Sequence, residues 1–310
     1  MGNCLVTKLK GVSSNQTLLK LGEFVVDFID KSTITFTEAH DGRVLNGYFT
    51  NASGDNLGTT KTNSESFTCS AGSKLLLTNK YGVNNISGNN DGKFTINVDC
   101  FMYNTLSGGF FKCNKSLVGD IANLRNKPLT SIQADGCKNL YGNFSDLNIS
   151  SNIAFLSLLG CPITMDVSVL SKFKNLQGVL SLPSNASGVL SITDINKDLD
   201  INAGYGDGLI TGDLSKLNGR VTKLNTQNRP NKFTWKSERP SSSYITIFDG
   251  YVDFGDDIDA MLINQAKCTK KLGGAFILRG NRTSASDAAV ATLQSKGFII
   301  WINDAQPNVG

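Results

Sequence analysis

The stretch LTSIQADGCKNLYG at residues 129–142 contains a pattern that returns further along the chain. The pattern is apolar-x-apolar-x-x-Cys/Asn, and its three copies are 24 residues apart: Ile132, Ala134 and Cys137; Leu156, Leu158 and Cys161; Leu180, Leu182 and Asn185. An apolar-x-x-apolar pair runs in step with it: Ile121/Leu124, Phe144/Leu147, Val167/Leu170, Leu190/Thr193 and Leu214/Leu217. Self-similarity at this period predicts a solenoid whose stacked repeats bury one continuous core.

The same period continues toward the C-terminus with weaker signature residues. The later copies are Ile201/Ala203, Leu224/Thr226, Ile245/Ile247, then Phe276, Leu278 and Asn281, and finally Ile299, Trp301 and Asp304. Residues 228–243, rich in Pro, Ser and charge, are expected on the irregular outer side of one repeat. Amphipathic patterns predict helices at 256–267 and 284–296. Strands that alternate with helices require a parallel sheet, because parallel strands need a crossover connection.

Residues 1–110 differ from the rest and predict a compact antiparallel β domain. Short stretches rich in β-branched and aromatic residues are separated by groups of Gly, Asn, Asp and Ser, at 24–29, 33–37, 44–50, 74–78 and 93–101. The expected fold class is therefore α+β, with residues 1–110 as an anchoring or assembly domain. Residues 111–310 form the solenoid, with β-α crossovers near its end.

The motif Leu129-x-x-Ile132-x-Ala134-x-x-Cys137-x-x-Leu140-x-Gly142 resembles a leucine-rich repeat. The copies at 156–161 and 180–185 extend the resemblance, which covers roughly residues 118–304. It implies one short parallel strand per repeat on the concave side.

The opening Asn3-Cys4-Leu5-Val6-Thr7-Lys8-Leu9-Lys10-Gly11-Val12, followed by residues 18–22, resembles the N-termini of proteins from phages of gut Bacteroidetes, including crAss-like phages. This resemblance implies that the β domain is a virion-docking module and the solenoid is the outward part. The expected location is the virion, as part of a tail, fibre or capsid appendage. The N-terminus lacks the apolar run of a signal peptide, which fits release by lysis.

Composition narrows the range of partners. The net charge of +4 is spread over 310 residues without a basic run, so nucleic acid is not an expected partner. The sequence contains no run of 18 apolar residues, so membrane insertion is not expected. The seven cysteines are an odd number and are interpreted as reduced thiols, with Cys137 and Cys161 in the same structural slot as Asn185, Asn281 and Asp304.

Few residues suit catalysis, so we predict no enzyme activity, no cofactor and no metal site. His40 is the one histidine and lies in a probable loop, and the cysteines lack C-x-x-C spacing. Asp256, Asp257 and Asp259 are interpreted as an acidic helix start, and Gly204-x-Gly206-x-Gly208 as a flexible bend. A tail-spike-like polysaccharide depolymerase remains an alternative, because it needs only two carboxylates, for example among Asp198, Asp200, Asp207 and Asp213.

The candidate binding surface consists of the residues between core positions on successive strands. They are Gln133, Ser157, Ser181, Asn202, Asn225, Thr246, Ile277 and Ile300. This row changes from polar to apolar toward the C-terminus, and an exposed apolar strip there suits a partner subunit. The expected partners are other virion proteins and a host surface glycan or protein, and virion appendages are generally homo-oligomers. A bacterial leucine-rich-repeat adhesin is a further alternative.

Overall fold

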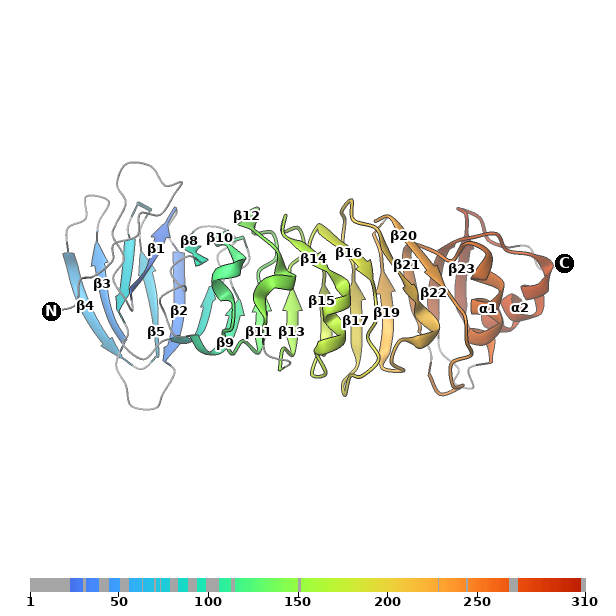
Figure 1. Ribbon diagram of the computed structural model, residues 1–310. Helices are drawn as coiled ribbons and strands as arrows, with labels where there is room; N and C mark the ends of the chain where they lie inside the picture. Colours follow the sequence, from blue (N-terminus) through green and yellow to red (C-terminus); the bar gives the residue numbers. More distant parts are fainter. Residues whose placement is uncertain are drawn as a thin grey trace.

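In the computed structural model the strands lie side by side along one long axis, from the N-terminal to the C-terminal end (Figure 1). The structure describes residues 23–29, 32–38, 45–50, 56–62, 64–69, 71–72, 74–78, 83–88, 94–98, 106–112, 115–149, 152–227, 229–243, 245–267 and 273–307. His40 and the residues of the phage-like N-terminus lie outside this part of the chain.

The N-terminal part is built from antiparallel strand pairs, as the sequence predicts. In one sheet β1 pairs with β6 and β8, and β3 pairs with β4 and β6. In a second sheet β2 pairs with β5 and β7. The bounds are β1 (Glu23–Phe28), β2 (Ser32–Glu38), β3 (Leu45–Thr50), β4 (Asn56–Thr62), β5 (Ser64–Cys69), β6 (Lys74–Thr78), β7 (Val83–Gly88) and β8 (Phe94–Asn97).

Parallel pairing takes over after β8. The first sheet continues from β8 into β10 (Leu117–Asp120) and β12 (Asn139–Tyr141). The second sheet continues from β7 with nine further strands that pair in parallel, so that it has 12 strands in total. These are β9 (Leu106–Lys112), β11 (Ser131–Gln133), β13 (Phe155–Ser157), β15 (Gly178–Ser181), β17 (Leu199–Asn202), β19 (Val221–Asn225), β21 (Ile247–Asp253), β22 (Gly274–Arg279) and β23 (Phe298–Ile302). Both sheets thus continue across residue 110, and the division into two domains there stays a prediction.

A four-stranded parallel sheet lies beyond β12. It contains β14 (Thr164–Asp166), β16 (Asn185–Val189), β18 (Ile210–Asp213) and β20 (Asn231–Thr234), and a bridge between Asn143 and Thr164 connects it to the repeat before. From β9 to β20 the chain therefore alternates between a strand of the 12-stranded sheet and a strand on the other side. The α+β class, with an antiparallel start and parallel sheets after it, is confirmed.

Four of the apolar-x-x-apolar pairs lie at short 3-10 helices. These are η2 (Ile121–Leu124), η3 (Phe144–Leu147), η4 (Val167–Lys172) and η5 (Leu214–Lys216), and the leading apolar side chain of each is buried. Each helix is preceded by Asp or Asn, whose Oδ1 accepts a hydrogen bond from the backbone N two residues on, at 2.9 to 3.1 Å. Such a cap satisfies a backbone donor that the helix start leaves free.

The fifth pair lacks this cap and also lacks the helix. Val189 stands where the other copies have Asp120, Asn143, Asp166 and Asp213, and residues 190–193 form no 3-10 helix. Most copies also place glycine just before the cap. At Gly142 a Cβ would lie 2.4 Å from Asp120 Oδ1, so glycine there leaves room for the cap of the preceding repeat.

The apolar residues of the repeats form one buried cluster that extends from Val26 to Ile302. Cys137 and Cys161 are both buried and form no disulfide, as expected, and Cys161 Sγ donates a hydrogen bond to Ala134 O at 2.9 Å. The contact with Cys137, together with burial, raises the pKa of Cys161. The assignment of Asn185, Asn281 and Asp304 to the same slot is wrong, because all three are exposed. Asn185 begins β16, and its amide donates to Pro162 O at the surface.

Both predicted helices are present between the last three strands of the 12-stranded sheet. They are α1 (Ile258–Ala266), preceded by the 3-10 turn η6 (Gly255–Asp257), and α2 (Asp287–Ser295), preceded by η7 (Ser284–Ser286). α1 buries Ile258, Met261 and Leu262, and α2 buries Ala289, Val290 and Leu293. The predicted strand-helix-strand order with parallel pairing is confirmed.

A buried arginine joins three repeats in the irregular middle. Arg229 donates through Nη1 to Ala186 O at 2.7 Å, and through Nη2 to Pro183 O at 2.7 Å and Tyr205 O at 3.1 Å. Its side chain is 1% exposed, and burial lowers its pKa to about 10, so it remains a cation at neutral pH.

The segments around Arg229 differ from their prediction. At Gly206 a Cβ would lie 1.8 Å from Ser184 O, so the glycine-rich bend is packed against the preceding repeat, and its interpretation as flexible is wrong. The sequence predicts residues 228–243 on the irregular outer side of one repeat. They instead include β20 and a second buried arginine, Arg239.

Replacement of a cap should reduce stability. We expect Asp166→Ala to lower the free energy of unfolding by about 1 kcal/mol, because the Ser168 N–H loses its acceptor. Conversely, Val189→Asp should raise it by up to about 1 kcal/mol by supplying the missing cap. Urea denaturation of both variants measures the two effects. Asp194→Ala, which removes only an exposed ion pair with Lys174, is the control and should change little. Equal losses in Asp166→Ala and Asp194→Ala would contradict the role of the cap.

Loss of Arg229 should cost more. Arg229→Ala removes a charged donor from the carbonyl oxygens of Ala186, Pro183 and Tyr205, so we expect a loss of about 3 kcal/mol in the free energy of unfolding. Arg220→Ala provides the matched control, since this side chain is 55% exposed and pairs with Asp198 at the surface. It should cost less than about 1 kcal/mol. A similar cost for both variants would show that the carbonyl contacts of Arg229 contribute little.

Candidate binding surface

Five of the predicted surface residues lie in one row across the 12-stranded sheet. Gln133 pairs with Ser157, Ser157 with Ser181, Ser181 with Asn202, and Asn202 with Asn225. Four of them are half-buried at the surface, and Ser181 is 5% exposed. The sequence period therefore found this row correctly through five strands.

The row continues at Asp249 and not at Thr246. Asn225 pairs with Asp249 on β21, whereas Thr246 precedes that strand and donates from both N and Oγ1 to Thr222 O. The placement of Thr246 in the row is therefore wrong. The sequence pattern aligned Ile245 and Ile247 with Leu224 and Thr226, which puts Thr246 beside Asn225. The connection between β19 and β21 is longer than this alignment requires, so Asp249 takes that place.

The prediction for the last strand is also wrong by one residue. Ile300 is 2% exposed and Ile302 is 8% exposed, while Ile299 and Trp301 are 57% and 41% exposed. Phe276 pairs with Ile300 and Ile277 with Trp301, so the true separation here is 24 residues, where the sequence count used 23. A slip of one residue moves every side chain to the other face of a strand.

Several polar side chains of the row accept hydrogen bonds from backbone N–H groups one or two residues further along the chain. Asn202 Oδ1 accepts from Gly204 N at 3.1 Å, Asn225 Oδ1 from Gln227 N at 2.9 Å, and Asp249 Oδ1 from Gly250 N at 2.7 Å. Ser157 donates to the carboxylate of Asp135, with distances of 2.7 and 2.8 Å to its two oxygens. The contacts of Asn202 and Asn225 form Asx turns at the ends of β17 and β19, whereas that of Asp249 lies inside β21, where the register with β22 shifts. Part of this polar row therefore has a structural role.

The C-terminal end of the same face is apolar. Ile299 and Trp301 on β23 are exposed beside the half-buried Ala275 and Ile277 of β22. Next to them the Arg279 guanidinium lies 4.5 Å from the centre of the Tyr251 ring. We call Ile277, Ile299 and Trp301 the apolar end of the surface. The sequence placed an apolar strip here, but with Ile300 in place of Ile299 and Trp301.

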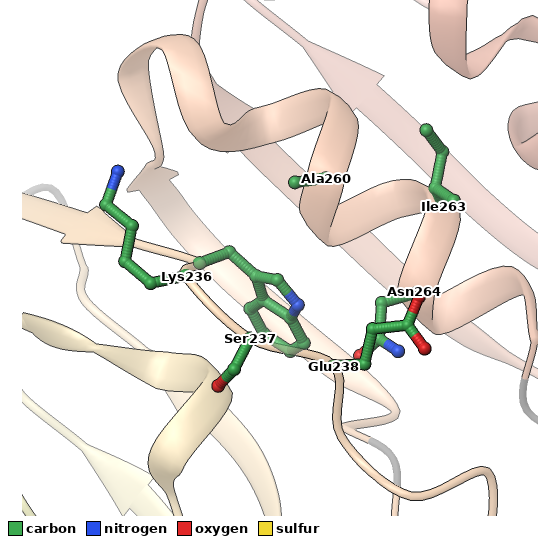
Figure 2. A pocket seen from close by; sticks show the side chains of 7 residues that line it. Lys236, Ser237, Glu238, Ala260, Ile263 and Asn264 are labelled. Carbon is green, nitrogen blue, oxygen red and sulfur yellow. The ribbon is translucent and has the colours of Figure 1, made fainter.

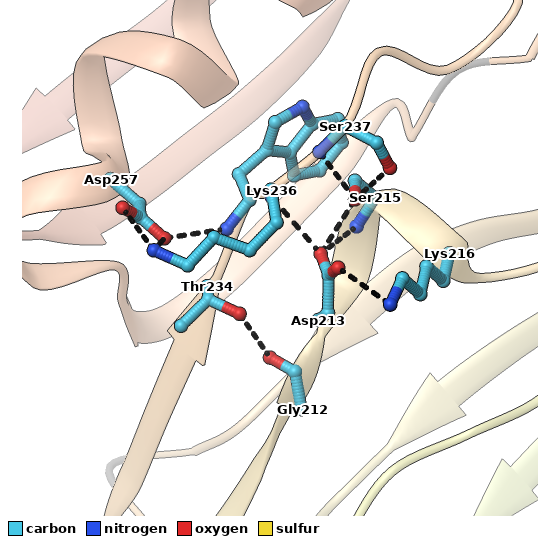
Figure 3. A network of polar contacts seen from close by, with 9 residues as sticks. Gly212, Asp213, Ser215, Lys216, Thr234, Lys236, Ser237 and Asp257 are labelled. Atoms are coloured by element: carbon cyan, nitrogen blue, oxygen red, sulfur yellow. Dashed lines mark hydrogen bonds and ion pairs between the residues drawn. The ribbon is translucent and has the colours of Figure 1, made fainter.

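The carboxylates considered for catalysis contact different partners. Asp198 pairs with Arg220 at 3.1 Å, Asp200 accepts from Thr222 Oγ1 at 2.7 Å, and Asp213 caps η5. Figure 3 shows Asp213 at the centre of a polar network, where it accepts from Ser215 and from Lys236 N. These contacts assign the three aspartates structural partners in neighbouring repeats.

The acidic start of α1 connects adjacent repeats. Asp256 accepts from Asn281 Nδ2 at 2.7 Å, and Asp259 accepts from Thr283 N and Oγ1. Asp257 accepts from Trp235 N at 2.9 Å and pairs with Lys236 Nζ at 2.7 Å. Burial acts to raise the pKa of Asp257, but the bonds from Lys236 and Trp235 lower it overall.

Among the residues that the structure describes, no three His, Cys, Asp or Glu side chains form a group that could bind a metal ion. No helix in the described part has both the length and the apolar character needed to cross a membrane.

Comparison with known proteins adds no relative. No family model, curated protein or solved structure matches the chain.

Proposed function

We propose that this chain is a non-enzymatic structural protein of a phage particle, in which a leucine-rich-repeat-like solenoid presents a contact surface. The N-terminal antiparallel part docks onto the particle, and the outer face of the 12-stranded sheet binds a partner. The observation that carries the binding role is the apolar end of the surface, where Ile299 and Trp301 are 57% and 41% exposed. Large apolar side chains grouped on a surface are typical of protein contact sites.

The order of elements supports the solenoid interpretation. From β9 to β20 each repeat contributes a short strand to the 12-stranded sheet, a strand on the other side and, in most copies, a capped 3-10 turn. Repeats of about this length that stack parallel strands are typical of leucine-rich-repeat architectures. Their extended surfaces commonly serve binding.

The position of the surface supports a partner that is another subunit of the particle. The apolar end lies at the last strands of the sheet, at the opposite end of the molecule from the N-terminal strands (Figure 1). A subunit docked by its N-terminal part would therefore present these side chains away from the docking point. Arg279 and Tyr251 beside them provide the polar rim found around many contact sites.

The virion assignment is tested by mass spectrometry of purified particles and of host cell-surface fractions. We expect peptides of this protein in the particles, at a constant ratio to the major capsid protein. Detection in cell-surface fractions alone would contradict the assignment and favour a bacterial adhesin.

The contact surface is tested with the double variant Ile299→Ser, Trp301→Ser. We expect at least a tenfold loss of incorporation into particles, since the variant removes the largest exposed apolar groups of the face. Leu209→Ser is the control, because Leu209 is 49% exposed but precedes β18 of the other sheet. Circular dichroism verifies that both variants fold. Normal incorporation of a folded double variant would overturn the proposed surface.

A further inference from the structure

A cavity of about 340 Å3 lies between α1 and the segment that follows β20. Figure 2 shows Lys236, Ser237 and Glu238 on one side, and Ala260, Ile263 and Asn264 of α1 on the other. Trp235 completes the lining. The cavity is on the side of the 12-stranded sheet covered by α1, so it is separate from the outer face that bears Ile299 and Trp301. Its size is at the lower end of the range found for small-molecule sites.

The walls of the cavity are held in place by contacts on both sides. Asp257 accepts from Trp235 N, and Ser215 Oγ accepts from Ser237 N at 3.1 Å, as the network in Figure 3 shows. Asn264 on α1 exchanges two hydrogen bonds with the backbone of Arg239, through Oδ1 at 3.1 Å and Nδ2 at 3.3 Å. A pre-formed site of this kind binds a ligand without the cost of ordering its walls.

The charges at the cavity are balanced. Lys236 pairs with Asp257, and Glu238 pairs with Lys267. Each cation is therefore neutralised by a carboxylate, and neither sign is in excess. Such a lining does not favour a strongly charged ligand, because an anion would meet Glu238 and Asp257, and a cation would meet Lys236 and Lys267.

The lining combines apolar contact with donors and acceptors. The side chains of Ala260 and Ile263 provide apolar area, and Ser237 and Glu238 provide polar atoms. These four side chains are exposed, whereas Trp235 is 3% exposed and its Nε1 is buried. A ligand in the cavity therefore contacts the four exposed side chains and reaches only the edge of the indole.

We propose that this cavity binds one neutral pyranose unit of a glycan, with an apolar face of the sugar ring against Ala260 and Ile263, beside the edge of Trp235, and its hydroxyls bonded to Glu238 and Ser237. A pyranose matches the lining because it is uncharged, has apolar ring faces and has hydroxyls that both donate and accept. The inference is independent of the surface of the proposed function, since it concerns the other side of the sheet.

The test uses tryptophan fluorescence. The chain has two tryptophans, Trp235 and Trp301, so Trp301→Phe leaves the cavity indole as the single tryptophan. This variant is titrated with the methyl glycosides of glucose, galactose, mannose and N-acetylglucosamine. We expect at least one to change the Trp235 emission saturably, with a dissociation constant on the order of 1 mM. Glucuronic acid, titrated in parallel, should bind at least several-fold more weakly.

A matched pair of alanine substitutions locates the binding. Ala260 and Ala288 are both exposed and lie in the first turns of α1 and α2. Ala260→Phe in the Trp301→Phe background should fill the cavity and raise the dissociation constant by about tenfold or more. Ala288→Phe should leave it unchanged. Glu238→Gln retains the shape of the side chain but removes its charge, and should weaken binding several-fold.

Three outcomes would overturn the inference. They are no change of Trp235 emission with any of the neutral sugars, equal binding by Ala260→Phe and Ala288→Phe, and preferential binding of glucuronic acid. Each leaves the particle assignment and the role of Ile299 and Trp301 untouched, because those rest on incorporation into particles. Conversely, a failed incorporation test would leave sugar binding at Trp235 intact.

Discussion

The strands of the middle repeats are too short to be stable alone, and lateral pairing with neighbouring repeats is the interaction on which the rest of the structure depends. β11, β12, β13 and β14 have three residues each, and every one pairs in parallel with the repeat before or after it. In such an arrangement each repeat is stabilised mainly by its nearest neighbours. The buried cluster from Val26 to Ile302 is the combined result of these local contacts.

The polar side chains of the repeats mostly support this stacking. Asp120, Asn143, Asp166 and Asp213 cap 3-10 turns, while Asn202 and Asn225 close turns at the ends of β17 and β19. Arg229 serves the same purpose inside the core, where it joins three repeats through backbone carbonyl groups. Many residues that seem available for chemistry in the sequence therefore already have a structural partner. Within the described part of the chain, the two places that we propose for recognition are the apolar end of the outer face and the cavity beside Trp235.

Prediction from sequence succeeded where apolar and polar residues alternate clearly. The buried pairs at Ile121/Leu124, Phe144/Leu147 and Val167/Leu170, the row from Gln133 to Asn225, and both helices followed from periodicity. In the N-terminal part β4, β5, β7 and β9 were missed, because their sequences are rich in Thr, Ser, Asn and Gly, which are typical of loops. The caps were also missed, although Gly-Asp or Gly-Asn precedes the apolar pair at 119, 142 and 212, and this repeated dipeptide was a usable signal.

The sequence by itself determined the parallel repeats and, as far as β19, their spacing, because a recurring apolar pattern requires stacked neighbours to bury it. It did not determine which side chains of β23 face the core, because Phe298–Ile302 is apolar at every position and shows no alternation of apolar and polar residues. There the lateral pairing of Phe276 with Ile300 and the packing beneath α2 decided that Ile299 and Trp301 face solvent. Only the tertiary structure brought Trp235 and Glu238 against α1, since the cavity forms between segments of adjacent repeats that no local pattern connects. The same reason applies to Arg229, whose carbonyl partners are 43 and 46 residues away in the chain for two of its three bonds.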